Sequence, residues 1–184
     1  MVFGVARGGR VNRTELAKRI RDAAYLEGDF TLRSGRKSKY YLDKYLFETQ
    51  PDILHALGAM FAERVADSTT LIAGAELGGI ALAAATSLAS GKPFVIIRNR
   101  RKDYGTGKPY EGKLAEGDGV LLVEDIATTG GQVLEAAQLI RDLGATVERI
   151  VAVIDRQEGA RENIEQAGFR FESLFTKADL GISS

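Results

Sequence analysis

The fold of this chain is decided by one stretch, Val120-Leu121-Leu122-Val123-Glu124-Asp125-Ile126-Ala127-Thr128-Thr129-Gly130-Gly131-Gln132. Its four opening residues are apolar and predict a buried strand, which we expect to end where the side chains turn acidic. The Thr-Thr-Gly-Gly segment predicts a polar turn, and the residues after it carry the spacing of a helix. Strand, turn and helix in this order are typical of an α/β protein with a parallel sheet.

The turn in this stretch has the features of a binding site for a phosphorylated sugar. Glycines let the backbone turn tightly, and a helix that starts beside them points its unpaired N–H groups at the same spot, which suits an anion. Glu124 and Asp125 stand at the carboxyl end of the strand, where open α/β sheets bind ligands, and suit hydroxyls or a metal ion. Such residues also end strands and cap helices without any ligand, so the stretch alone leaves a structural role open. It holds neither a Walker loop nor a dinucleotide fingerprint.

Composition excludes several other classes of protein. The 184 residues suffice for one domain, and 25 basic residues balance 25 acidic ones, which argues against non-specific binding of nucleic acid. Without cysteine there is no disulfide, no thiol catalysis and no zinc–thiolate site, and the single histidine, His55, excludes a multi-histidine metal site. No apolar run approaches the length of a membrane span, and we expect a cytoplasmic protein.

Strands and helices alternate at the spacing of a parallel sheet that is covered on both faces. We expect strands at 71–73, 94–97, 120–123, 147–154 and 169–175, and helices at 14–26, 51–65, 80–90, 132–143 and 160–167. Gly28 is expected to end the first helix, and 30–43 to form an antiparallel hairpin outside the main sheet. The prediction is a single domain at 1–184, with a flexible arm at 1–12, a small hood at 13–50 and an α/β core at 51–184.

Two basic segments are candidates for contact with an anionic substrate. The loop 98–112 holds basic residues between glycines and lies directly before the central strand, as expected of a lid that closes over an active site. A solvated surface loop is the alternative. The segment 33–39 is small and basic, and is either a binding turn or an ordinary hairpin turn.

Taken together, four segments in this order resemble the type I phosphoribosyltransferases, and within that family the orotate enzymes. They are the central stretch 120–132, the hairpin segment Phe30-Thr31-Leu32-Arg33-Ser34-Gly35-Arg36-Lys37-Ser38-Lys39-Tyr40-Tyr41, the loop 98–112 and the segment Asp155-Arg156-Gln157-Glu158-Gly159-Ala160. The resemblance implies a central, mainly parallel sheet flanked by helices, with an N-terminal hood that contains a helix and a hairpin. It also implies transfer of ribose 5-phosphate from 5-phosphoribosyl 1-diphosphate to orotate, which gives orotidine 5′-monophosphate and diphosphate in pyrimidine biosynthesis.

The resemblance implies roles for individual residues. The implied contacts with 5-phosphoribosyl 1-diphosphate come from Arg98, Arg101, Lys102, Tyr104, Glu124, Asp125, Ile126, Ala127, Thr128, Thr129, Gly130, Gly131 and Gln132, and those with orotate from Arg33, Tyr41, Thr128 and Arg156. Lys102 and Asp125 are the implied catalytic residues, because the lysine neutralises the leaving diphosphate and the carboxylate holds the ribose as C1′ gains positive charge. The segment 74–79 is the implied diphosphate loop. Mg²⁺ is the implied cofactor, held mainly through the diphosphate and the ribose near Asp125, and a homodimer is implied, whose lid acts across the interface.

Several positions depart from the family pattern. Many relatives have histidine where this chain has Tyr104, and some have lysine where it has Arg33, Asn99 or Gly78. The charge lost at the last two positions is expected to come from Arg100 or Arg101, so the departures bear on individual contacts of the lid and barely on the reaction.

Two other functions compete with transfer to orotate. One is transfer to a purine or another base in the same fold, and the other is regulation by a protein that binds 5-phosphoribosyl 1-diphosphate without catalysis. Thr128, Arg156 and the hairpin segment favour orotate. The loop 98–112 keeps Lys102, which favours catalysis. The arm at 1–12 is too short for a helix-turn-helix, which argues against a DNA-binding regulator.

Overall fold

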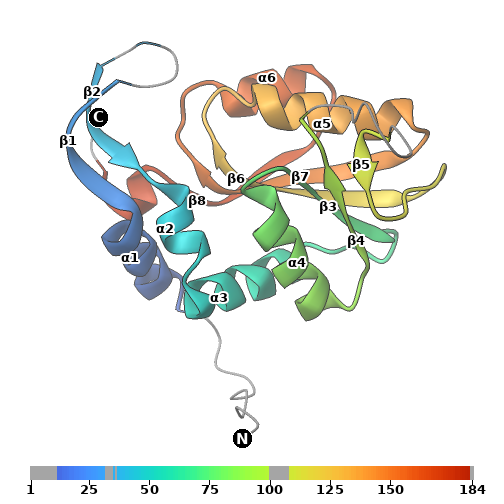
Figure 1. Ribbon diagram of the computed structural model, residues 1–184, viewed down its shortest axis with the longest axis horizontal. Helices are drawn as coiled ribbons and strands as arrows, with labels where there is room; N and C mark the ends of the chain where they lie inside the picture. The colour runs from blue at the N-terminus through green and yellow to red at the C-terminus, as the bar shows by residue number, and fades with distance from the viewer. Residues whose placement is uncertain (1–11, 32–34, 36, 100–107, 183–184) are drawn as a thin grey trace, which may run out of the picture.

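The computed structural model describes residues 12–31, 35, 37–99 and 108–182. Within them a six-stranded sheet lies between two groups of helices (Figure 1). The strand order is β5-β4-β3-β6-β7-β8, and neighbours are parallel except for the antiparallel pair β4 and β5. The strands are β3 (Leu71–Ala75), β4 (Phe94–Ile97), β5 (Tyr110–Glu111), β6 (Gly119–Ala127), β7 (Thr146–Asp155) and β8 (Phe171–Thr176).

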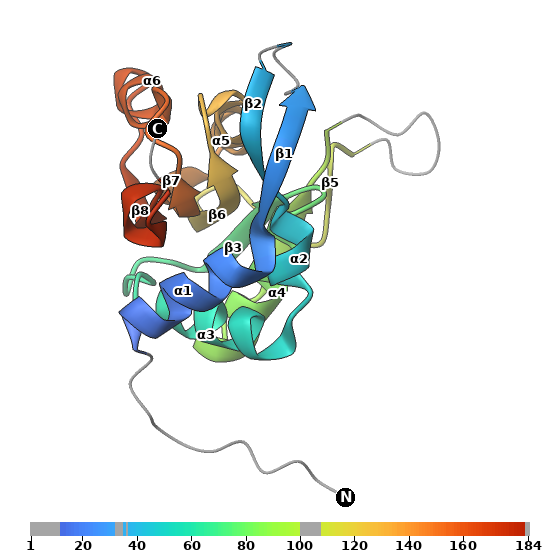
Figure 2. The same ribbon diagram turned by 90° about the vertical axis from the view of Figure 1, so that its left-hand side faces the viewer.

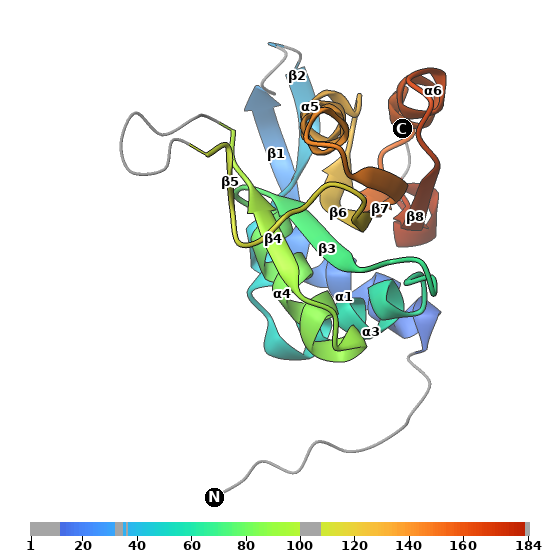
Figure 3. The same cartoon turned by 90° about the vertical axis from the view of Figure 1, so that its right-hand side faces the viewer.

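The helices cover both faces of this sheet, as Figure 3 shows. One face carries α1 (Arg13–Ala24), α2 (Lys44–Glu48), α3 (Pro51–Ala62) and α4 (Gly79–Ser90), and the other carries α5 (Gly131–Asp142) and α6 (Ala160–Gln166). A short 3-10 helix, η1 (Ala178–Leu180), follows β8. The predicted mainly parallel, doubly covered sheet is confirmed. In the described part of the chain, no helix combines the length and the apolar character needed to cross a membrane.

Strand β6 explains why the central stretch specifies this architecture. Leu121 and Val123 pack into the core under α1 to α4, whereas Val120 and Leu122 pack into the core under α5 and α6. Side chains of a strand alternate between its faces, so a continuous apolar run is what a sheet buried on both faces requires. Each fully buried side chain of this size stabilises the fold by about 1.5–3 kcal/mol relative to an exposed one.

The N-terminal hairpin stands apart from the main sheet (Figure 2), as predicted. It consists of β1 (Tyr25–Thr31) and β2 (Lys37–Leu42), which pair antiparallel. The predicted end of the first helix at Leu26 and Gly28 is wrong, because α1 already ends at Ala24. Tyr25 instead pairs with Leu42 and stacks on Tyr40 with ring centroids 5.6 Å apart, and these strand contacts outweigh the helical spacing of the local sequence.

Two boundaries in the core also differ from the prediction. Strand β6 does not stop at the acidic residues but continues to Ala127, because β7 extends to Asp155 and pairs with β6 up to that residue. The loop 98–112 contains a short strand, β5, which adds an antiparallel edge to the sheet. In both places the partner strand, and not the local polarity, sets where pairing ends.

Candidate active site

A cleft of about 1310 Å³ lies at the carboxyl ends of β6 and β7. Its walls come from the hairpin, α2, the ends of both strands and the first turn of α5. Its lining residues are Tyr41, Lys44, Asn99, Glu124, Asp125, Ile126, Ala127, Thr128, Thr129, Gly130, Gly131, Gln132, Val133, Glu135, Arg156 and Glu158. The cleft therefore collects nearly all of the central stretch, together with residues that are distant from it in sequence.

The turn between β6 and α5 forms an anion site on one side of this cleft. Gly130 has a φ of 79°, a left-handed conformation that glycine adopts without strain, and it precedes the first residue of α5. No side chain of the described residues caps this helix. Asn163 of α6 holds the turn in place, because its Nδ2 donates to the Thr129 carbonyl oxygen at 2.9 Å. The N–H groups of the first turn of α5 are thus directed at the cleft, where the helix dipole favours negative charge.

Two carboxylates lie on the other side of the turn. Glu124 and Asp125 are 7% and 3% exposed, although both line the cleft. Asp125 accepts from two donors, since its Oδ1 takes the Ile126 N–H at 2.5 Å and its Oδ2 takes Lys44 Nζ at 2.6 Å. Burial, followed by the charge of Asp125, raises the pKa of Glu124 to about 8. Burial alone would lower the pKa of Lys44, but its ion pair with Asp125 outweighs that effect and raises it.

A third carboxyl group, that of Glu48 in α2, adjoins this pair. It is 3% exposed, and within the described residues its Oε1 has no hydrogen-bond partner. Burial, and then the charge of Asp125, raises its pKa to about 8. A Cβ at Gly78 would stand 1.8 Å from Asp125 Oδ2 and 3.2 Å from Glu48 Oε1, so these two oxygens flank the same point. The cluster is acidic, and only a residue without a side chain fits beside it.

The predicted diphosphate loop is tied to the start of α5. The carbonyl oxygen of Glu76 accepts from Gln132 Nε2 at 2.8 Å and from Asn99 Nδ2 at 3.0 Å. The Glu76 carboxylate in turn accepts the Asn99 backbone N–H at 2.8 Å. These bonds hold the segments after β3, β4 and β6 against one another at one edge of the cleft.

Arg156 occupies the far end of the cleft, after β7. Its backbone N–H donates to the Ala127 carbonyl oxygen at 2.9 Å, which fixes it beside the end of β6. Its Nη2 lies 2.9 Å from Glu158 Oε1 and 3.4 Å from the Tyr40 hydroxyl, and its guanidinium lies 5.6 Å from the Tyr40 ring centroid. Its buried Nε has no partner among the described residues. Tyr41 lines the cleft from the same hairpin. This end therefore presents a cation beside the Tyr40 ring, an arrangement that suits a planar anion.

Most of the predicted site residues meet in this one cleft. Arg98 lies beside it instead, with its Nη1 3.4 Å from Glu111 Oε1. Four of the predicted contacts lie outside the described residues: Arg33, Arg101, Lys102 and Tyr104. So does Arg100, which was expected to replace missing charge.

Sequence reasoning missed Lys44 and Glu48. They stand four positions apart and hence share one face of α2. A charged pair with this spacing, flanking the apolar residues Leu46 and Phe47, was the available signal.

The chain is similar to known proteins in sequence and in fold. Residues 46–175 match the family model of the phosphoribosyl transferase domain. The chain is 49% identical over 164 residues to the orotate phosphoribosyltransferase of Halobacterium salinarum, which covers 89% of this chain and 93% of that one. Among solved structures it is similar to the orotate phosphoribosyltransferase of Mycobacterium tuberculosis in complex with Fe(III) dicitrate, with a TM-score of 0.83, 34% identity and coverage of 92% and 98%. The complex of that enzyme with 5-phospho-alpha-D-ribosyl 1-diphosphate matches with a TM-score of 0.77, 34% identity and the same coverage.

Proposed function

We propose that this chain, which belongs to the phosphoribosyltransferase family and within it to the orotate phosphoribosyltransferases, binds both substrates in the cleft at the ends of β6 and β7. The reaction transfers ribose 5-phosphate from 5-phosphoribosyl 1-diphosphate to orotate, and it yields orotidine 5′-monophosphate and diphosphate in pyrimidine biosynthesis. One observation carries the assignment of the cleft. The cleft brings together the uncapped N-terminus of α5, two buried acidic side chains and Arg156. These groups match the phosphate, the ribose hydroxyls and the orotate carboxylate respectively.

Each group then has a task in the reaction. The N–H groups of the first turn of α5, with the Thr128 and Thr129 hydroxyls, hold the 5′-phosphate. Glu124 and Asp125 accept hydrogen bonds from the ribose hydroxyls. The Asp125 carboxylate, ion-paired with Lys44, favours the positive charge that C1′ gains as the diphosphate departs. Arg156 pairs its planar fork with the orotate carboxylate, and Thr128 and Tyr41 complete the base site.

The leaving diphosphate requires positive charge, which we assign to Lys102, with Arg98 and Arg101. Lys102 and Arg101 lie outside the described residues, so their roles rest on the resemblance of the segment 98–112. We further propose that the lid acts across a homodimer interface. Heterodimers that combine Lys102→Ala in one subunit with Asp125→Asn in the other are expected to recover part of the activity, because one of their two sites is intact. No recovery in verified heterodimers contradicts an interface-crossing lid.

We also propose that the reaction uses Mg²⁺. Among the described residues no group of three acidic or histidine side chains is arranged as metal ligands. We expect the ion to be carried mainly by the substrate's diphosphate and ribose oxygens, near Asp125, since Mg²⁺ keeps several waters and often binds through substrate phosphates. Bound in that way, it would neutralise charge on the diphosphate.

A turnover assay tests the assignment. Orotate, 5-phosphoribosyl 1-diphosphate and MgCl₂ are mixed with the protein, and the loss of orotate absorbance is followed. We expect turnover with orotate, none with adenine or guanine, and none when EDTA replaces MgCl₂. Turnover without a divalent ion contradicts the metal proposal, and absence of turnover in every arm contradicts the enzyme. We place the reaction in the cytoplasm because its multiply charged substrate does not cross membranes; recovery of the activity in a membrane fraction contradicts that placement.

A further inference from the structure

Lys44 reaches the cleft from α2, an element on which no predicted site residue lies. Its Nζ donates to Asp125 Oδ2 at 2.6 Å across 81 positions of sequence, and its side chain is 28% exposed at the cleft wall. The ammonium also lies 5.3 Å from the Tyr45 ring centroid. The lysine is therefore held on two sides, and it is not a freely solvated surface residue.

The ion pair fixes the orientation of the Asp125 carboxylate. One oxygen is held by the Ile126 N–H and the other by Lys44. A carboxylate oxygen can accept more than one hydrogen bond, so both oxygens keep capacity for a ligand while the two donors set the plane of the group. Without the ammonium, Oδ2 would lose the donor that holds it.

The groups beside Asp125 include other carboxyl groups, which offer its charge no positive partner. Glu48 and Glu124 are buried beside it, and the point between Glu48 and Asp125 is taken by Gly78, which brings no side chain. Asp43, which begins α2, adds a further carboxylate that acts on Glu48. Lys44 is the cation that the described residues place within hydrogen-bonding distance of this cluster. A buried carboxylate that lost this ammonium would turn away or become protonated, and in either form it would hold a ribose less well.

We propose that Lys44 is a positioning residue of the reaction, which holds Asp125 in the orientation that receives the ribose hydroxyls. The inference rests on the role proposed above for Asp125. It assigns the ammonium to the carboxylate and not to the leaving diphosphate, so the ribose and diphosphate ends of the substrate should respond differently to its loss.

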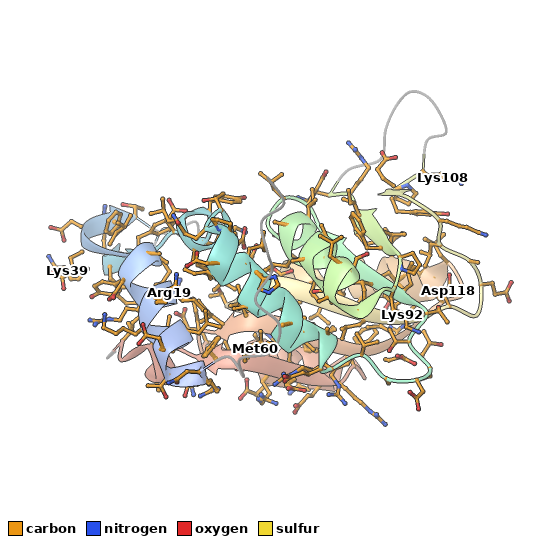
Figure 4. The ribbon with its side chains drawn as sticks, turned by 90° about the horizontal axis from the view of Figure 1, so that it is seen from below. Arg19, Lys39, Met60, Lys92, Lys108 and Asp118 are labelled. Atoms are coloured by element: carbon orange, nitrogen blue, oxygen red, sulfur yellow. The ribbon has the colours of Figure 1, made fainter. Side chains whose placement is uncertain are left out.

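Chemical replacement of the lysine separates charge from bulk. The chain has no cysteine, so Lys44→Cys introduces its only thiol. Alkylation with 2-bromoethylamine then rebuilds a lysine-like ammonium, whereas iodoacetamide adds a neutral group of similar size. Lys18→Cys is the matched control, because Lys18 lies in α1 next to Arg19, which Figure 4 labels, and does not line the cleft. Its side chain is 67% exposed and is paired with Asp22. Mass spectrometry and thermal unfolding verify complete modification and an intact fold.

We expect Lys44→Cys to lower kcat/KM for 5-phosphoribosyl 1-diphosphate on the order of 10- to 100-fold, as a misplaced catalytic group does. The KM for orotate should change less than about twofold, because Arg156 is untouched. Aminoethylation should restore kcat/KM to within about threefold of the wild type, and carbamidomethylation should not. Every form of the Lys18→Cys control should match the wild type.

Calorimetry with ribose 5-phosphate and with inorganic diphosphate, each alone, completes the test. Ribose 5-phosphate should bind Lys44→Cys more weakly than the wild type, and diphosphate should bind both equally. Weakened diphosphate binding with unchanged ribose 5-phosphate binding overturns the inference. In the alkylation experiment, equal rescue by 2-bromoethylamine and iodoacetamide, or rescue by neither, also overturns it. So does a kcat/KM of Lys44→Cys equal to that of the wild type. Failure of the proposed function is distinguishable, because the wild type itself would then not turn over orotate.

Discussion

Gly78→Ala should lower the activity of the enzyme more than the stability of its fold. The new Cβ would stand 1.8 Å from Asp125 Oδ2, whereas real Cβ contacts essentially never fall under 3.0 Å, so the oxygen must move by more than 1 Å. That movement breaks the 2.6 Å bond to Lys44 or turns the carboxylate out of the cleft. A displacement of this size costs on the order of 100-fold in kcat/KM, or about 2.7 kcal/mol.

The expected loss of stability is smaller because two effects oppose each other. Gly78 has φ −64° and ψ −37°, a conformation that alanine adopts readily, and the substitution stabilises the chain by about 0.4–1 kcal/mol through the unfolded state. The lost charge-assisted hydrogen bond costs about 1.5–3 kcal/mol. The net loss is about 0.5–2.6 kcal/mol. At about 2–4 °C per kcal/mol for a chain of this size, Tm should fall by roughly 1–10 °C.

The assay pairs steady-state kinetics with thermal unfolding, and Gly58→Ala serves as the control. There a Cβ would lie 2.8 Å from the backbone of Ala85, between α3 and α4 and away from the cleft lining. Gly58→Ala should therefore lower Tm while the folded protein keeps its kcat/KM within about twofold. If Gly78→Ala keeps its kcat/KM within threefold of the wild type, or if both variants lose activity in step with Tm, the steric reasoning is wrong.

Three further outcomes follow from the charged groups. Glu48→Gln should gain stability relative to the wild type as pH rises: burial lifts the pKa of Glu48 from 4.5 to about 8, so the native state retains a proton that the unfolded chain has released, and wild-type stability falls between these pH values. Calorimetry at pH 5 and pH 9 should show a Tm difference that grows, and a constant one would count against the burial argument. Arg156→Ala should raise the KM for orotate by about 10- to 100-fold, the equivalent of a charge-assisted hydrogen bond of about 1.5–3 kcal/mol, and an unchanged KM would remove Arg156 from the base site. Asp179→Asn should lower Tm at pH 7 by a few degrees at most, since its pair with Arg13 is partly exposed and such pairs contribute about 1 kcal/mol or less. The hydrogen bond from Arg13 holds the pKa of Asp179 at about 2, so this contribution is present above pH 3.8 and lost as pH falls towards 2; a Tm deficit that stays undiminished from pH 7 to pH 2.5 would refute it.

The parts of the fold that the sequence predicts are those with a local cause. The run Val120–Val123 must be buried on both faces wherever it lies, and Phe94–Ile97 was predicted with the bounds that β4 has. The errors lie where a distant partner decides. Strand β6 continues through two acidic residues because β7 is long enough to pair with this part of the strand. Helix α1 ends earlier than predicted because Tyr25 stacks on Tyr40 of the hairpin. Both partners, β7 and Tyr40, are distant in sequence, so the residues at the boundary do not predict them.

The site divides along the same line. Carboxylates at a strand end and a glycine turn before a helix are local features, and the central stretch carries both. One of the two donors that hold Asp125 comes from elsewhere: Lys44 lies 81 positions away in a helix of five residues. In so short a helix the spacing of Lys44 and Glu48 is a weak local signal. Local pattern therefore reveals the groups that face a substrate, but not the groups that fix their charge and orientation.

Lys44 can hold Asp125 because α2 is anchored to the core of the protein. Five residues cannot form a stable helix by themselves, so α2 depends on Phe47, which is fully buried against the core below the sheet. With Phe47 packed in the core, the side chains of Lys44 and Glu48 lie beside Asp125 of β6. The orientation of the ribose carboxylate thus depends on hydrophobic packing in the hood. A substitution that loosens Phe47 should act on the ribose end of the substrate before it unfolds the domain, because α2 has little stability of its own with which to hold Lys44 in place.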